Sequence, residues 1–337
     1  MKQILLTKHG APEVFKVREV PEPMPSSGEL KVCVKAAGVN YADVMARLGL
    51  YPDAPPPPCV VGYEVSGIVE AVGPDVDPSW IGKEVIAATR FGGYSSKLCV
   101  PLSGVFSKPP CLSFEQAGGL FVNYVTAWQL LVALGGLKKG ETLLIHNAGG
   151  GVGLAALDIA KHIGASTLGT ASERKHDFLK ERGLGQAIDY RSQDFTKEVR
   201  KLTQGRGVDL VIDPLGGSHW KQSYAVLAPA GRLGMFGMST ATESRVGFFG
   251  LLKFLGGTPW FHPISLMNKN RGVFGVNVGH LWEETRLVRG WVEEILRGVQ
   301  DGWVNPHVDR PFRLEEAARA HRYLEERRNI GKVVLIP

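Results

Sequence analysis

The first 120 residues alternate short apolar runs with glycine and proline clusters. Apolar runs occupy 30–36, 67–72 and 84–88, and four consecutive prolines at 55–58 favour an extended, stiff loop. Short strands separated by frequent turns are typical of antiparallel sheets and barrels. The pattern therefore predicts a β-rich domain over residues 1–121.

From residue 122 to about 265 the pattern changes to apolar strands that alternate with amphipathic helices. Strands are expected at 142–146, 166–170, 187–190, 208–213 and 232–236, and helices at 152–163, 172–183, 192–204 and 218–227. Strict alternation of this kind predicts a parallel, doubly wound sheet with right-handed crossovers. We therefore expect an α/β Rossmann domain at 122–265.

The last 70 residues break this rhythm. A strand is expected at 271–279, helices at 284–298 and 314–327, and a closing strand at 332–336. We expect residues 266–337 to supply an edge strand to the Rossmann sheet and then to return to the first domain. The Rossmann domain would then be inserted between two halves of the other domain, with a cleft between them.

Composition adds limits to this picture. The chain has 337 residues, a formal charge of +6 and four cysteines, Cys33, Cys59, Cys99 and Cys111. The basic residues are scattered, which favours a solvated surface and anionic cofactors over a nucleic-acid partner. No pair of cysteines has metal-finger spacing, and the chain opens without a signal-like leader. The most apolar tract, 246–261, is interrupted and too short to span a bilayer, so a cytoplasmic protein with reduced thiols is expected.

A glycine-rich loop follows the first strand of the predicted Rossmann domain. Residues 147–153 read Asn-Ala-Gly-Gly-Gly-Val-Gly, with Ala148, Gly150 and Gly153 at the three spaced positions of a dinucleotide-binding fingerprint. The loop also opens a helix, whose N-terminus favours phosphate. This context predicts a nicotinamide dinucleotide cofactor.

The end of the next strand indicates which dinucleotide. Sites for NAD place a carboxylate about 20 residues after the loop, on the ribose 2′-hydroxyl, and no carboxylate stands at 168–170. Ser172, Arg174 and Lys175 instead offer a hydroxyl and two cations for a 2′-phosphate, and Tyr190 follows the third strand. NADP is therefore expected, although Arg174 and Lys175 could also form an ordinary solvated helical turn.

The first domain lacks the usual ligands of a catalytic zinc ion. Tyr63 follows Gly62 where a zinc enzyme would carry histidine, and Cys99 is the single cysteine between Lys83 and Pro109. Without a Lewis acid, stabilising an alkoxide is difficult. Hydride addition to a polarised acceptor such as a quinone or enone needs only positioning and exclusion of water.

Several segments together resemble one enzyme family. They are AAGVNYADVMARLGLYP (36–52), GYEVSGIVEAVG (62–73), FVNYVTAW (121–128), IHNAGGGVGLAA, GTASERKH, IDY, GVDLVIDPLGG and GKVVLIP. Over essentially the whole chain the sequence resembles the zinc-free quinone oxidoreductase (zeta-crystallin-like) branch of the medium-chain dehydrogenase/reductase superfamily, and most closely its vesicle amine transport protein-like members. The resemblance implies a GroES-like catalytic domain, a Rossmann domain that binds NADP, and a homodimer, which the strand at 271–279 could form by extending the sheet.

The resemblance also implies roles for individual residues. Asn40, Asp43 and Tyr51 would be catalytic or line the substrate side. The cofactor-binding set would be Asn40, Thr126, Gly150, Gly151, Val152, Thr170, Ser172, Lys175, Tyr190, Leu215, Gly237, Met238, Phe274, Val276 and Lys332. The sequence departs from the family at Asn147, where alanine is common, and over 241–268, where the match is loose.

Some residues allow a purely structural interpretation. Asn40 could be a turn residue, Tyr51 could only pack the proline loop, and Tyr63 is expected to be a core tyrosine with a satisfied hydroxyl. His146 is expected to be structural. The aromatic tract at 246–261 could be a lid, a dimer contact or a peripheral membrane contact.

The expected function is an NADPH-dependent reductase for quinones or other α,β-unsaturated carbonyls. An NADPH-binding protein with little turnover, working at a membrane or with a partner protein, is the alternative. RNA binding is the weakest hypothesis, because no platform of basic and aromatic residues is visible.

Overall fold

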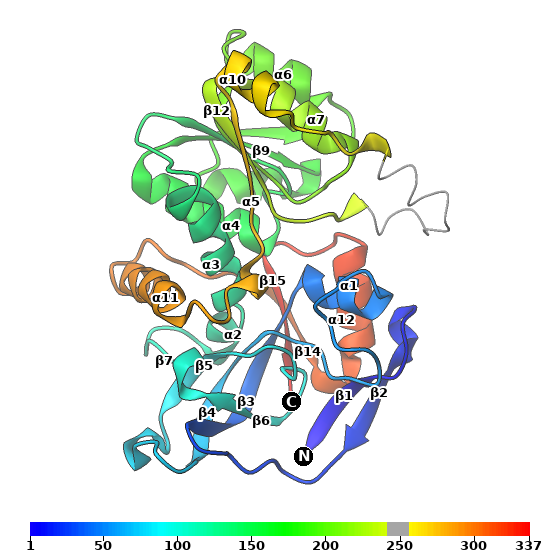
Figure 1. Cartoon of the computed structure of the whole chain (residues 1–337), viewed down its shortest axis with the longest axis vertical. Coiled ribbons are helices and arrows are strands. Elements are labelled where there is room, and N and C mark those ends of the chain that lie inside the picture. Colours follow the sequence, from blue (N-terminus) through cyan, green and yellow to red (C-terminus); the bar gives the residue numbers. More distant parts are fainter. Residues whose placement is uncertain (241–255) are drawn as a thin grey trace. The chain divides into compact units, whose positions relative to one another are not determined.

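The computed structural model describes residues 1–240 and 256–337 (Figure 1). The chain forms two compact units. Unit 1 comprises Met1–Val125 and Val278–Pro337, and unit 2 comprises Thr126–Asn277. The domain boundary predicted at 122 lies close to the observed start of unit 2 at Thr126. The boundary predicted at 265 lies 12 residues before the observed end of unit 2 at Asn277. Residues 246–255 of the aromatic tract lie outside the described residues.

Unit 1 is built on a seven-stranded sheet in the order β14-β15-β3-β4-β5-β7, with β6 paired to β3. Its strands are β3 (Glu29–Val39), β4 (Glu64–Val72), β5 (Glu84–Ala88), β6 (Lys97–Pro101), β7 (Val105–Ser107), β14 (Val308–Arg313) and β15 (Lys332–Ile336); β1 (Lys2–Leu6) and β2 (Phe15–Glu19) form a separate hairpin. The pairings are antiparallel except β14 with β15. This is the β-rich, GroES-like architecture that the sequence predicts.

The core of unit 1 follows from the alternation along its strands. In β3, Leu30, Val32 and Val34 are buried while Lys31 and Cys33 between them are only half-buried, as expected for a strand with one face on the core. Helices are short or peripheral: α1 (Tyr41–Leu48), α2 (Phe114–Gly118), α3 (Phe121–Trp128, at the unit boundary), α11 (Thr285–Gln300) and α12 (Ala317–Glu325). Single 3-10 turns lie at Pro12–Val14, Pro78–Trp80, Leu102–Gly104, Val278–His280 and Leu314–Glu316.

Unit 2 contains a six-stranded parallel sheet in the order β10-β9-β8-β11-β12-β13. The strands are β8 (Thr142–Ile145), β9 (Ser166–Ala171), β10 (Gln186–Asp189), β11 (Val208–Asp213), β12 (Leu227–Met235) and β13 (Gly272–Gly275). The helices are α4 (Gly151–Ile163), α5 (His176–Glu181), α6 (Phe195–Leu202), α7 (Ser218–Ala225) and α10 (Pro263–Lys269), with a π-helical turn at Gln129–Ala133. The strand order reverses between β8 and β11, which is the Rossmann arrangement with its ligand site at the switch point. The predicted fold class is thus confirmed.

Most predicted elements of unit 2 are found, with four differences at their ends. The helix expected from 172 begins with a 3-10 turn at Glu173–Lys175, and α6 begins only after Asp194, whose side chain accepts a hydrogen bond from Thr196 N at 2.9 Å. The strand expected at 271–279 is reduced to four residues in β13. The strand expected from 232 starts earlier, at Leu227, and its pairing with β11 shifts register between Val208 and Leu210.

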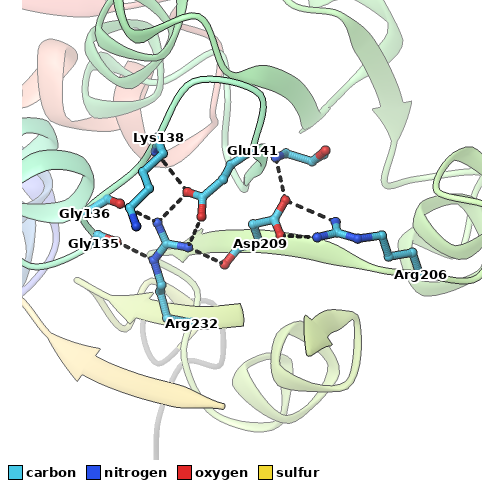
Figure 2. Close-up of polar contacts among 8 residues, drawn as sticks. Gly135, Gly136, Lys138, Glu141, Arg206, Asp209 and Arg232 are labelled. Atoms are coloured by element: carbon cyan, nitrogen blue, oxygen red, sulfur yellow. Dashed lines mark hydrogen bonds and ion pairs between the residues drawn. The ribbon is translucent and has the colours of Figure 1, made fainter. Parts of the chain in front are cut away.

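The amino ends of the central strands are tied together by a network around Arg232 (Figure 2). The Arg232 guanidinium donates to both carboxylate oxygens of Glu141, at 3.1 and 2.7 Å, and to the Asp209 carbonyl at 3.1 Å. The Asp209 carboxylate in turn accepts from Thr142 N at 2.8 Å and pairs with Arg206 at 2.6 Å. These contacts join β8, β11 and β12 at the edge opposite the carboxyl ends.

Candidate functional site

The glycine-rich loop lies at the carboxyl end of β8 and leads directly into α4. Gly150 is the N-cap of α4, and Gly151 and Val152 open its first turn, half-buried. A Cβ on Gly150 would stand 2.6 Å from Asn147 Nδ2, so a larger residue would displace the loop. The first amides of a helix have no partner within it and attract anions. The loop is therefore shaped as a phosphate cradle.

The predicted selectivity residues follow the carboxyl ends of the neighbouring strands. Thr170 belongs to β9, and Ser172 and Lys175 come directly after it; all three are buried. A Cβ placed on Gly149 would be only 2.8 Å from Lys175 Cδ, so the Lys175 chain lies against the glycine-rich loop. Arg174 and Tyr190 are exposed. Lys175 is thus not the solvated cation that the alternative interpretation required.

The other predicted cofactor residues of unit 2 stand at or near the ends of further strands of the same sheet. Because all six strands are parallel, these positions share one edge. Leu215 follows β11, Gly237 and Met238 follow β12, and Phe274 and Val276 belong to or follow β13, where Val276 N donates to the Met235 carbonyl at 2.8 Å. Thr126 is buried in α3.

A buried cluster beneath this edge was not anticipated. Asp213, the last residue of β11, accepts hydrogen bonds from Leu215 N at 2.7 Å and from Ser223 Oγ at 2.6 Å, and pairs with His219 Nδ1 at 2.6 Å. Burial alone would raise the pKa of Asp213, but the bonds from His219 and Ser223 lower it to about 2. The carboxylate therefore fixes the turn that carries Leu215.

His146 completes this cluster as the structural residue that the sequence predicted. Its Nδ1 lies 3.0 Å from Thr170 Oγ1 and its Nε2 3.1 Å from Ser223 Oγ. Burial, and then the neighbouring His219, lower the pKa of His146 to about 3, so the ring is neutral. It thereby links the ends of β8 and β9 to α7.

In unit 1, two predicted residues, Asn40 and Lys332, form a buried polar group with Glu64, which was not predicted. Lys332 Nζ donates to Glu64 Oε1 and to Asn40 Oδ1, each at 2.6 Å, and Asn40 Nδ2 donates to Glu64 Oε1 at 3.1 Å. The second oxygen of Glu64 accepts from Val122 N at 2.9 Å. A Cβ on Gly38 would stand 2.6 Å from Glu64 Oε1, so glycine there leaves room for the carboxylate.

Asp43 extends this group from the first turn of α1. Its carboxylate accepts from Asn40 N at 2.8 Å, from Gly62 N at 3.1 Å and from the Tyr94 hydroxyl at 3.1 Å. Burial raises the pKa of Asp43 to about 7, and the hydrogen bond from Asn40 and the charge of Lys332 only partly offset this. Asn40 is therefore more than a turn residue, since its side chain also binds Lys332 and Glu64.

The chain of contacts continues away from Asp43. The Tyr94 hydroxyl lies 3.0 Å from His321 Nε2, and Arg47, fully buried, reaches His321 Nδ1 at 3.4 Å and pairs with Glu325. Burial holds the pKa of Tyr94 well above, and that of His321 well below, its ordinary value. Both groups are therefore neutral and brace α1 against α12.

Four aromatic rings gather beside Asp43. Tyr63 is contacted edge-on by Tyr51, with centroids 6.2 Å apart, and at a tilt by Phe91 at 4.9 Å. The ring of Trp282 is nearly parallel to Tyr63, with an interplanar angle of 13° and centroids 6.5 Å apart. The Tyr63 hydroxyl is buried and has no hydrogen-bond partner among the described residues. The expectation of a satisfied core hydroxyl was therefore wrong for the described residues, although the expectation of burial was right.

The described residues of unit 1 contain no group of three histidine, cysteine or acidic side chains placed to share a metal ion. In unit 2, ligand atoms of His146, Asp213 and His219 lie within 4.8 Å of one another. Two ligands of one tetrahedral zinc ion stand about 3.3 Å apart, whereas Asp213 and His219 are hydrogen-bonded at 2.6 Å. The cluster is therefore built as a hydrogen-bond network.

Comparison with known proteins places this architecture in a family. Residues 26–134 match the alcohol dehydrogenase GroES-like domain and residues 182–335 match the zinc-binding dehydrogenase family. The human synaptic vesicle membrane protein VAT-1 homolog is 36% identical over 346 residues, which cover 100% of this chain and 86% of that protein. The chain belongs to the medium-chain dehydrogenase/reductase superfamily.

Further medium-chain relatives place the chain in the branch that joins VAT-1 homologs and quinone oxidoreductases, and so confirm the resemblance. A quinone oxidoreductase of Pseudomonas aeruginosa is 32% identical over 338 residues, covering 100% of this chain and 99% of that protein. The quinone oxidoreductase of Escherichia coli, solved in complex with NADPH, has a TM-score of 0.89 at 30% identity, with full coverage of both chains.

The predicted site residues of this medium-chain enzyme divide between the units. Asn40, Asp43, Tyr51 and Lys332 belong to unit 1, and the other predicted cofactor residues belong to unit 2. Sequence reasoning missed Glu64, although a glutamate that opens the apolar strand β4 is a signal of buried charge. It also missed Tyr94, Phe91 and Trp282, which no local motif distinguishes. No helix among the described residues is both long and apolar enough to cross a bilayer.

Proposed function

We propose that the chain is an NADPH-dependent oxidoreductase that reduces quinones or other α,β-unsaturated carbonyls without zinc. The observation that carries the choice of cofactor is the buried Lys175 against the glycine-rich loop, directly after β9. A buried cation beside a phosphate cradle fits a 2′-phosphate, and Glu173, two residues before Lys175, is exposed. The NADPH complex of the related E. coli enzyme supports the same choice.

Each predicted residue has a role consistent with this proposal. Gly150, Gly151 and Val152 would hold the pyrophosphate at the N-terminus of α4. Thr170, Ser172, Lys175 and Tyr190 would surround the 2′-phosphate end, and Thr126, Leu215, Gly237, Met238, Phe274 and Val276 would line the rest of the cofactor groove. Bound NADPH supplies the hydride.

In unit 1, Asn40, Asp43 and Lys332 would present fixed hydrogen-bonding groups and charge near the reacting atoms, with Tyr51 beside the acceptor. Their positions depend on the buried contacts with Glu64 and Tyr94. Groups fixed before the substrate binds need no reorganisation during the reaction. The chemistry needs no Lewis acid, because a quinone or enone carbonyl already polarises the carbon that receives the hydride.

The test is oxidation of NADPH against a panel of quinones and enones, with NADH in parallel and with EDTA in matched samples. Turnover that prefers NADPH and is unchanged by EDTA is the expected result. Turnover abolished by EDTA and restored by zinc contradicts the metal-free proposal. Tight NADPH binding without turnover on any acceptor contradicts the reductase proposal.

A second role, contact with a membrane surface or partner protein, is favoured by an exposed apolar face near α10. Trp260, Ile264 and Met267 are 90%, 60% and 73% exposed. Ile264 and Met267 are three residues apart on one side of α10, and Trp260 lies just before that helix. We propose that this face makes the peripheral contact. Sedimentation with anionic liposomes tests it: Trp260→Ser should reduce binding, and unchanged binding contradicts the assignment.

We also propose a homodimer formed through β13. Among the described strands, β13 is at the edge of the sheet and pairs with β12 alone, so its outer edge can pair with a second copy. Light scattering after gel filtration should give twice the mass of the chain. A strictly monomeric protein contradicts the proposal.

A further inference from the structure

Tyr63 is a buried hydrogen-bond donor that the fold leaves unused. Its side chain is 6% exposed, and its hydroxyl has no hydrogen-bond partner among the described residues. A buried hydroxyl without a partner is costly, and native proteins rarely keep one without a reason. The polar side chains that act on this hydroxyl in unit 1 are those of Tyr51, Asp43 and Asp53, and both carboxylates are also bound to other residues. Within the described part of the chain, the hydroxyl therefore lacks a partner that a ligand could supply.

The backbone holds the Tyr63 ring in one place. The preceding residue, Gly62, donates its N–H to Asp43, and the following residue, Glu64, is bound by Lys332. The Tyr63 carbonyl accepts from Thr89 N at 2.9 Å. With both neighbours and its own carbonyl fixed, the ring is a preorganised group and not a mobile one.

The rings around Tyr63 are suited to a flat, electron-poor molecule. Phe91, Tyr51 and Trp282 are each half-buried, so each ring is also partly accessible. The ring of Trp282 is nearly parallel to that of Tyr63, with centroids 6.5 Å apart, and being half-buried it leaves ring surface for a third ring. The cluster offers stacking surface and, in Tyr63, a donor without a partner among the described residues.

We propose that the Tyr63 hydroxyl donates a hydrogen bond to the carbonyl oxygen of the acceptor, and that Trp282, Phe91 and Tyr51 select planar, quinone-like acceptors over small aliphatic enones. This assignment rests on the proposed reductase function and names the substrate class of the same site. It gives Tyr63, the residue in the position of a zinc ligand, a direct contact with the substrate.

The role of Tyr63 in the reaction is that of a donor that keeps its proton. Reduction of a quinone consumes one hydride and one proton and yields a hydroquinone and NADP⁺. Hydride addition places negative charge on a carbonyl oxygen, and the phenol stabilises that charge by its hydrogen bond. Burial, and then Tyr51 and Asp43, raise the pKa of Tyr63 above its ordinary value. The one proton that the reaction consumes therefore comes from water.

The first experiment compares wild type with Tyr63→Phe, which keeps the ring and removes the hydroxyl. With 1,4-naphthoquinone, kcat/KM should fall about 10-fold to 100-fold, the loss expected for one hydrogen bond to a charge-bearing oxygen. The Kd for NADPH should stay within about twofold. Trp282→Ala should raise the KM for naphthoquinone about tenfold and change the KM for methyl vinyl ketone much less.

Tyr224→Phe is the matched control. Tyr224 also carries a buried hydroxyl without a partner among the described residues, but it packs on Phe261 in unit 2. The kcat/KM of the Tyr224→Phe enzyme should equal that of wild type. If Tyr63→Phe also keeps wild-type kcat/KM with an active enzyme, the assignment of Tyr63 is wrong and the reductase proposal stands.

Calorimetric titration with the substituted quinone menadione separates the two proposals. If wild type shows no turnover but binds menadione, and Tyr63→Phe binds it about tenfold more weakly, the assignment of Tyr63 is supported and the reductase proposal fails. If menadione binds equally to both proteins or to neither, the assignment is overturned.

Discussion

The buried pair of Lys332 and Glu64 gives the sharpest test of how unit 1 is held together. Their side chains are 5% and 0% exposed, and the ammonium and carboxylate are 2.6 Å apart. Lys332→Met removes the cation and leaves Glu64 with Asn40 and Val122 as its remaining donors. Removing one partner of a buried ion pair costs about 3–5 kcal/mol, because the other charge stays unpaired in the interior.

The measurement is urea unfolding followed by circular dichroism. With a urea m value of about 2 kcal/mol per molar, a loss of about 4 kcal/mol lowers the midpoint by about 2 M. Lys332→Met/Glu64→Gln removes both charges and should recover part of this loss, since a double substitution leaves neither charge isolated.

An exposed pair provides the control. Arg297 and Glu294 are 2.8 Å apart, but their side chains are 60% and 48% exposed. Arg297→Met should cost less than about 1 kcal/mol, because solvent screens the pair. Equal, small effects of Lys332→Met and Arg297→Met would refute the reasoning that burial and not distance sets the cost.

Three further outcomes are expected. Burial raises the pKa of Asp43 from 3.8 to about 7, so between these pH values the folded state binds more protons than the unfolded chain. The protein therefore loses stability as pH rises through that window, by at most about 1.4 kcal/mol per pH unit. Thermal unfolding of Asp43→Asn from pH 4 to 8 should lack this slope, and an unchanged slope would assign it to another group. Lys175→Ala should weaken NADPH binding about tenfold or more without affecting NADH binding. The control, Lys180→Ala at an exposed position, should leave the affinity for both cofactors unchanged. Equal losses of affinity for NADPH and NADH in Lys175→Ala would argue against a 2′-phosphate contact. Arg232→Ala should destabilise the protein by about 1.5–3 kcal/mol yet leave the Kd for NADPH unchanged, because its contacts are at the amino edge of the sheet (Figure 2); a large change in that Kd would show that the two edges are coupled.

The parts of this protein that could be predicted from sequence are those governed by local pattern. The alternation of 142–213 fixed the order of β8 to β11 and their helices, because each strand and helix has its own periodicity. The cofactor edge followed from topology, since the carboxyl ends of parallel strands share one edge. The predictions were wrong at the ends of elements, where a single hydrogen bond decides at which residue a helix begins, as at Asp194 before α6.

The buried pair could not be predicted, because its members are 268 residues apart and each opens a largely apolar strand. Local sequence indicates a charge in such a strand but gives no partner for it. The pairing depends on β15 returning from the end of the chain to lie beside β3, with register that sets Val333 opposite Val39. Charge in the interior is thus specified by sheet topology.

Tyr63 shows the same limit from the opposite direction. The sequence signals that a zinc ligand is missing beside Gly62, and burial of an isolated tyrosine suggests a satisfied hydroxyl. Its actual surroundings come from three segments, around Tyr51, Phe91 and Trp282, which supply aromatic rings, and its hydroxyl has no hydrogen-bond partner among the described residues. A missing hydrogen bond is a property of the assembled packing, and it distinguishes a tyrosine placed for a ligand from one placed for the core.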